Sequence, residues 1–131
     1  MVICDKHRKR ANEIASMVVI GDVTGKDIVI IDDICDTGGT LAKSAALLME
    51  KGARSVRALI THPVLSGKAY ENLENSVLDE VVVCDTIPIK PGSSKIKVIS
   101  VAELFAVAIR NAFENKSITS LFIHSQRRTS L

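Results

Sequence analysis

The chain has 131 residues, of which 47% are hydrophobic and 24% charged, which excludes a disordered chain and favours one globular domain. Its formal net charge is +2 and only 3% of its residues are aromatic, so neither nucleic-acid binding nor another polyanionic partner is indicated. The three cysteines lie far apart without metal-ligand spacing, and no apolar run is long enough to cross a membrane. We therefore expect free thiols, a cytoplasmic location and no membrane partner.

Strands and helices alternate along the sequence. Apolar runs predict parallel strands, each covered on both faces, at 28–31, 55–61, 80–86 and 96–101. Helical spacing and stop signals predict helices from Thr40 to about Gly52, over 66–75, and from Ser100 onward. This alternation predicts an α/β fold with an open, mainly parallel sheet flanked by helices, whose ligands bind at the carboxyl ends of the strands.

The two ends of the chain carry further signals. Ser100 and Glu103 form a capping box, and the apolar stripe that follows, from Val101 to Phe113, is expected to be core. A first strand at Val2–Cys4 begins almost at Met1, and a strand inside such a sheet normally has neighbours on each side. We therefore expect this chain to be the carboxyl-terminal part of a larger protein.

The stretch "VIIDDICDTGGT", residues 29–40, contains the main chemical signal. Asp32 and Asp33 are adjacent carboxylates at a strand end, and they repel each other unless a vicinal diol or a divalent cation shares them. The glycine turn that follows, Asp36–Thr40, places successive N–H groups and threonine hydroxyls at a helix N-terminus, which suits a phosphate. A diol at one end and a phosphate at the other describe ribose 5-phosphate.

Two other interpretations of this stretch have to be weighed. Gly38 and Gly39 could simply make a strand-to-helix turn capped by Asp36 or Thr37, but such a turn does not explain the paired aspartates. The letters "DDICD" also match the D-D-x-x-D motif of prenyl-diphosphate enzymes. That motif lies in a helical bundle, whereas the apolar run at 28–31 predicts a strand.

The same stretch resembles the phosphoribosyl-pyrophosphate-binding motif of type I phosphoribosyltransferases. Together with "DKHRKRAN", "THPVLSGKA", "LDEVVVCDTIP", "KIKVISVAELFAVAIR" and "SITSLF" in this order, it makes the chain similar to the ribose-phosphate diphosphokinase family, the phosphoribosyl pyrophosphate synthetases. The resemblance implies one phosphoribosyltransferase-like domain over residues 1–122, followed by a tail at 123–131.

This resemblance implies transfer of a diphosphoryl group from ATP, bound with Mg²⁺, to the anomeric hydroxyl of ribose 5-phosphate, with release of AMP. Asp32 and Asp33 would hold the ribose hydroxyls. The loop around the 5-phosphate would consist of Asp36, Thr37, Gly38, Gly39 and Thr40.

Further roles are implied outside this motif. Lys6 and Arg8 match the two cations of the family's catalytic loop, although "KHRKR" alone would be read as a solvated basic loop or a nucleic-acid patch. Ser117 and Thr119 match part of an allosteric nucleotide site between subunits, and a helix end followed by a packing turn would explain them equally well.

The resemblance also implies what this chain lacks. In the family, the ATP-binding residues and the magnesium ligands lie in an amino-terminal half that has no counterpart here, and His62 and His124 match no metal pattern. We therefore expect the isolated chain to be inactive and the full-length protein to be a homo-oligomer. Two alternatives remain: a non-catalytic associated or regulatory subunit of the same family, or a nucleobase phosphoribosyltransferase, which would need a base-binding hood.

Overall fold

The computed structural model describes residues 3–7 and 16–121, and it divides into two compact units, Met1–Ile99 and Ser100–Leu131, which we treat separately. The predicted boundary at residue 122 and the tail lie outside the described residues. Among the residues described, no helix has the length and hydropathy needed to cross a membrane.

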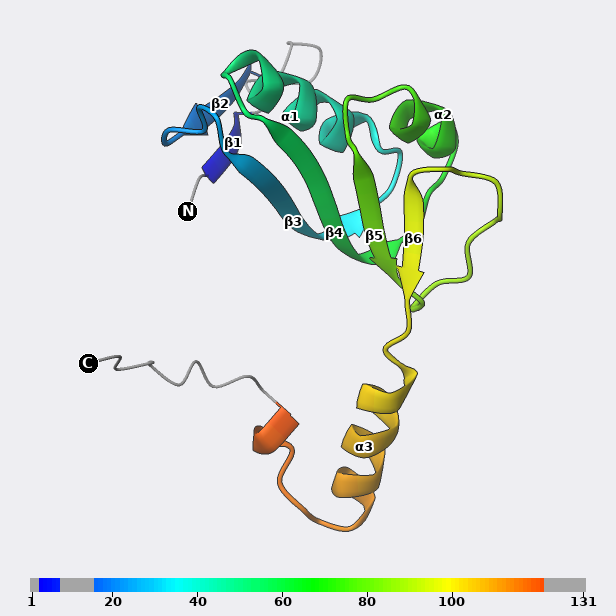
Figure 1. Cartoon of the computed structure of the whole chain (residues 1–131). Helices are drawn as coiled ribbons and strands as arrows, with labels where there is room; N and C mark the ends of the chain where they lie inside the picture. The colour runs from blue at the N-terminus through cyan, green and yellow to red at the C-terminus, as the bar shows by residue number, and fades with distance from the viewer. Residues whose placement is uncertain (1–2, 8–15, 122–131) are drawn as a thin grey trace, which may run out of the picture. The chain divides into compact units, whose positions relative to one another are not determined.

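The first unit is built on a four-stranded parallel sheet (Figure 1). Its strands, in spatial order, are β3 (Asp27–Cys35), β4 (Ser55–Pro63), β5 (Glu80–Cys84) and β6 (Ile96–Ile99). The register aligns Ile30 of β3 with Ala58 of β4, which aligns with Val81 of β5. The predicted α/β fold with an open, mainly parallel sheet is thereby confirmed.

Two helices, α1 (Gly39–Glu50) and α2 (Ala69–Glu74), share one core with this sheet. Along β4 the side chains of Val56, Ala58 and Ile60 are buried in that core, whereas alternate residues such as Leu59 are exposed. Right-handed crossovers between strands that are added in one direction place their helices on the same face of the sheet. Within this unit the two helices cover one face only, and Ile31 on the other face is 78% exposed; cover on both faces stays a prediction.

A second, two-stranded sheet pairs β1 (Ile3–His7) antiparallel with β2 (Ser16–Ile20). The strand expected at Val2–Cys4 thus extends further along the chain, to His7. The strand Ser16–Ile20 was not predicted at all.

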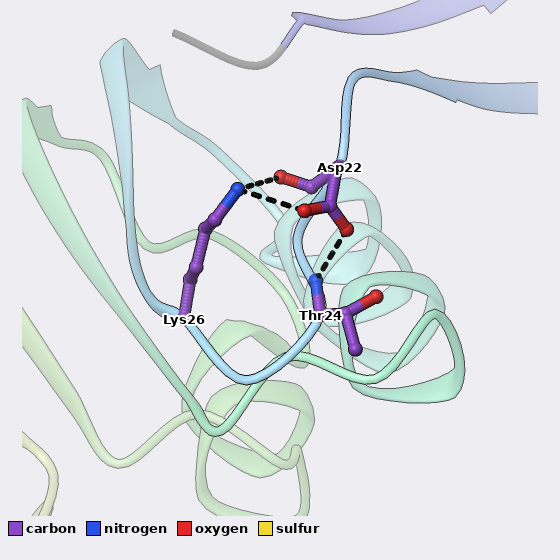
Figure 2. Close-up of polar contacts among 3 residues, drawn as sticks. All are labelled: Asp22, Thr24 and Lys26. Carbon is purple, nitrogen blue, oxygen red and sulfur yellow. Dashed lines mark hydrogen bonds and ion pairs between the residues drawn. The ribbon is translucent and has the colours of Figure 1, made fainter.

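The turn between β2 and β3 is held by its own side chains (Figure 2). The carboxylate of Asp22 accepts a hydrogen bond from the N–H of Thr24 at 3.0 Å, and it forms an ion pair with Nζ of Lys26 at 2.9 Å. The hydrogen bond from Lys26 is the main reason why the pKa of Asp22 is lowered from 3.8 to about 2. This turn lies at the amino end of β3, which is the edge of the sheet opposite to the carboxyl ends of its strands.

The second unit contains α3 (Ala102–Phe113) and the 3-10 turn η1 (Thr119–Leu121). The helix lies where it was predicted, but its N-cap residue is Val101, and the hydroxyl of Ser100 accepts its hydrogen bond from the N–H of Ala102 rather than from Glu103. Within this unit the apolar stripe of α3 is not buried, and Phe113 is 88% exposed. A single helix and one turn offer too little surface to cover it.

Candidate functional site

A cavity of about 360 Å³ opens at the carboxyl edge of the parallel sheet, where β3 ends and α1 begins. The predicted site residues that line it are Asp32, Asp36, Thr37, Gly38 and Thr40. Its remaining walls are Ile34, Cys35, Leu41 and Ile60. The structure therefore gathers most of the predicted motif around one hollow, while Asp33 and Gly39 are its chain neighbours without lining it.

The backbone of the glycine turn has a conformation and a position that disfavour a side chain at Gly38. Gly38 adopts a φ of 71°, in the left-handed region, and a Cβ there would lie 3.1 Å from Cγ of Leu73. The first hydrogen bond of α1 runs from the N–H of Ala42 to the carbonyl of Gly38, so the preceding N–H groups stand at the open N-terminus of the helix. Such a terminus favours an anion in the adjoining cavity.

At the acidic end of the cavity, the surroundings disfavour the charged form of Asp32. Burial raises the pKa of Asp32, and the neighbouring carboxylate of Asp33 raises it further, although the N–H of Asp33 donates a 2.9 Å hydrogen bond to Oδ1 of Asp32. Hydroxyl donors from a ligand would stabilise the charged form of such a pair. The shared diol stays a prediction, since Asp32 lines the cavity and Asp33 does not.

Cys35 was not predicted as part of the site, but it lines the cavity. Burial is the main reason why the pKa of its thiol is raised.

The other predicted site residues do not line this cavity. Lys6 lies on β1, where it is paired with Met17 of β2, and Arg8 lies outside the described residues. In the second unit, the hydroxyl of Ser117 donates to that of Thr119 at 2.8 Å and accepts from the N–H of Thr119 at 3.1 Å. The roles proposed for these four residues stay predictions.

A divalent cation is the other ligand that an acidic pair can share. In the described part of the chain, no group of three or more His, Cys, Asp or Glu side chains is arranged to hold a metal ion. His62 instead contacts Thr86, with 2.9 Å from its Nδ1 to the hydroxyl. That hydroxyl donates to the carbonyl of Thr61, so Nδ1 must be the donor to it. We therefore derive no chemical step from a metal held by the described residues.

The sequence interpretation also missed two residues that form hydrogen bonds with the loop without lining the cavity. The side chain of Asn72 donates to the carbonyl of Thr37 at 2.8 Å, and the hydroxyl of Ser66 donates to the carboxylate of Asp36. Ser66 belongs to the conspicuous stretch "THPVLSGKA", which was noted without a function. Nothing in the sequence marked Asn72.

With this geometry in view, the chain was compared with known proteins. Residues 5–123 match the family model described as "Phosphoribosyl synthetase-associated domain". The chain is 57% identical over 123 residues to a ribose-phosphate pyrophosphokinase of Wolinella succinogenes and 54% identical over 123 residues to one of Campylobacter jejuni. A crystal structure of phosphoribosylpyrophosphate synthetase from Mycobacterium smegmatis superimposes with a TM-score of 0.75 at 40% identity.

These matches differ in what they cover. Each of the two pyrophosphokinases aligns with 94% of this chain but with only 40% of its own length, and the crystal structure covers 86% of this chain and 37% of its own. The chain therefore spans less than half the length of the relatives that it matches.

Proposed function

The chain belongs to the phosphoribosyl synthetase-associated domain family, and from this premise we propose that it forms the ribose 5-phosphate-binding part of a ribose-phosphate pyrophosphokinase. The observation that carries the proposal is the cavity itself, which places the carboxylate of Asp32 and the turn Thr37–Gly38 around one hollow at the N-terminus of α1. An acidic pair suits the ribose hydroxyls, and the turn suits the 5-phosphate.

In the proposed reaction, the anomeric hydroxyl of ribose 5-phosphate attacks the β-phosphorus of ATP. The bond between the anomeric oxygen and that phosphorus forms, the bond from that phosphorus to the oxygen of the α-phosphate breaks, AMP leaves with that oxygen, and the hydroxyl proton passes to solvent. This chain would bind and orient the sugar through Asp32, Asp33 and the loop of residues 36–40. The ATP with its Mg²⁺ would be held outside the residues described here, in accord with the 40% coverage of the relatives.

Lys6 and Arg8 are proposed to stabilise the charge that builds on the phosphoryl oxygens. Lysine offers a compact charge and arginine a bidentate fork, and loss of one such group costs on the order of 10³-fold in rate. Ser117 and Thr119 are proposed as part of a regulatory nucleotide site in a full-length homo-oligomer. A cytoplasmic location is proposed because three widely spaced cysteines without a pairing or metal-binding pattern suit a reducing compartment.

The test of the sugar site is a titration of the ¹⁵N-labelled chain with ribose 5-phosphate, with ribose, and with inorganic phosphate. We expect ribose 5-phosphate to shift the amide signals of residues 32–40 and to bind more tightly than either fragment. An amide response confined to other parts of the chain, or no response, would refute the proposal.

A matched pair of variants sharpens this test. Asp33→Asn removes one of the two charges that would accept the ribose hydroxyls, so we expect weaker binding of ribose 5-phosphate and unchanged binding of inorganic phosphate. Asp79→Asn makes the same change at an exposed residue just before the amino end of β5 and should leave both affinities unchanged. The isolated chain is expected to release no AMP from ATP. Release of AMP at the rate of a full-length relative would contradict that expectation.

A further inference from the structure

The loop of residues 35–38, which lines the cavity, is held in place by a short segment of chain that does not line it. We call this segment, residues 65–72, the buttress segment. Three successive carbonyls of the loop accept hydrogen bonds from it. The carbonyl of Cys35 accepts from the N–H of Leu65 at 3.1 Å, and that of Asp36 accepts from the N–H of Ser66 at 3.0 Å. The carbonyl of Thr37 accepts from the side-chain amide of Asn72 at 2.8 Å.

These three bonds fix the direction of the peptide groups in the loop. In a trans peptide the carbonyl of one residue and the N–H of the next point in opposite directions. With the three carbonyls turned toward the buttress segment, the N–H groups of Asp36, Thr37 and Gly38 are turned away from it. None of the buttress residues lines the cavity, whereas Cys35 and the three loop residues that follow it do line it.

The packing between the two segments supports the same arrangement. Leu65 adopts a φ of 48°, a conformation that L-residues rarely hold, and its side chain is only 7% exposed. Gly38 approaches Leu73 and the carbonyl of Ala69 so closely that a side chain has no room there. The segment therefore keeps its position relative to the loop by close packing as well as by hydrogen bonds.

We propose that Asn72 is a positioning residue that orients the Thr37–Gly38 peptide so that the loop presents a concave set of N–H groups to a phosphate. Of the three carbonyl partners, Asn72 is the one that acts through its side chain, so it is the one that substitution can remove. Successive N–H groups that converge in this way bind anions. This inference rests on the proposed function, because it assigns the 5-phosphate of the sugar to the loop.

The test compares Asn72→Leu with Asn75→Leu. Both substitutions replace an asparagine by leucine, Asn72 within α2 and Asn75 at its C-cap, but Asn75 is exposed and its side chain makes no hydrogen bond with the loop in the described structure. Each purified full chain is titrated with inorganic phosphate and with ribose 5-phosphate, while the amide signals of residues 36–38 are followed. Urea unfolding of each variant is recorded in parallel.

Loss of one hydrogen bond that holds a binding group corresponds to about a three- to tenfold loss of affinity. We expect that loss for phosphate and for ribose 5-phosphate in Asn72→Leu, and no loss in Asn75→Leu. Asn72→Ser, whose hydroxyl is too short to reach Thr37, serves as the second variant should the leucine prevent folding, and it should show the same loss.

Each outcome bears on the proposal. Folded Asn72 variants that bind phosphate as tightly as the parent chain would overturn it, and so would a parent chain whose residues 36–38 do not respond to phosphate. A parent chain that binds phosphate at these amides but does not prefer ribose 5-phosphate would refute the proposed function and leave the role of Asn72 standing. Equal affinity for phosphate together with lower stability would assign Asn72 a purely structural role.

Discussion

Gly38→Ala tests the idea that the turn of the site depends on contact with α2. Gly38 and Gly25 have nearly the same φ, 71° and 69°, in the left-handed region, so the conformational cost of an alanine is about 1 to 2 kcal/mol at either position. At Gly25 a Cβ would meet nothing within 4 Å. At Gly38 it would lie 3.1 Å from Cγ of Leu73, which is fully buried, and 3.4 Å from the carbonyl of Ala69.

Overpacking of a buried site costs about 1 to 3 kcal/mol. We therefore expect Gly38→Ala to lower the free energy of unfolding by about 2 to 5 kcal/mol and Gly25→Ala by about 1 to 2 kcal/mol. Urea unfolding followed by circular dichroism measures both, since the chain contains no Trp. Combining Gly38→Ala with Leu73→Ala should recover the difference in a double-mutant cycle. Equal effects of the two glycine substitutions, or no coupling to Leu73, would refute the packing argument.

Three further predictions concern titratable groups. Because the pKa of Asp32 is raised in the folded chain, ionisation of this carboxyl opposes folding above pH 3.8. Asp32→Asn should therefore raise the urea midpoint at pH 7 and leave it unchanged at pH 3. The same substitution should weaken the binding of ribose 5-phosphate. The pKa of Asp22 is lowered to about 2, so its stabilising contribution is present above pH 3.8 and lost as the pH falls toward 2; Asp22→Asn should lower the urea midpoint at pH 7 but not at pH 2. Iodoacetamide should alkylate the half-buried Cys84 before the buried Cys35, as followed by peptide mass spectrometry, and the reverse order would contradict the burial of Cys35.

The strands of the parallel sheet were predictable because each is rich in β-branched and other apolar residues and is followed by a turn or a helix signal. Their order was not, because pairing between strands depends on contacts that are distant in sequence. Once the order β3-β4-β5-β6 is known, the placement of both helices on one face follows from the right-handed crossover. The strand Ser16–Ile20 was missed because it lies outside the strand–helix alternation of the parallel sheet and pairs antiparallel with a strand at the start of the chain.

The candidate site also has one part that could be predicted from the sequence and one part that could not. The part that lies within one stretch, from Asp32 to Thr40, was predictable because strand, acidic pair and glycine turn follow one another directly. The part that holds the turn in place was not predictable. Ser66 lies 30 residues from Asp36, and Asn72 lies 35 residues from Thr37, and neither has a pattern that would indicate its contact.

The aspartates at the two edges of the sheet show why the cavity is the place to look for a ligand. At the amino edge, Asp27 forms an ion pair with Arg54 and accepts a hydrogen bond from Ser55, and its pKa is lowered chiefly by Arg54. At the carboxyl edge, the pKa of Asp32 is raised, and among the described residues no ion pair includes Asp32 or Asp33. The acid at the amino edge is thus paired with a cation of the same fold, whereas the acids at the carboxyl edge can accept hydrogen bonds from a ligand. The hydroxyls of a sugar are such donors, and hydrogen bonds from them would stabilise the charged form of Asp32.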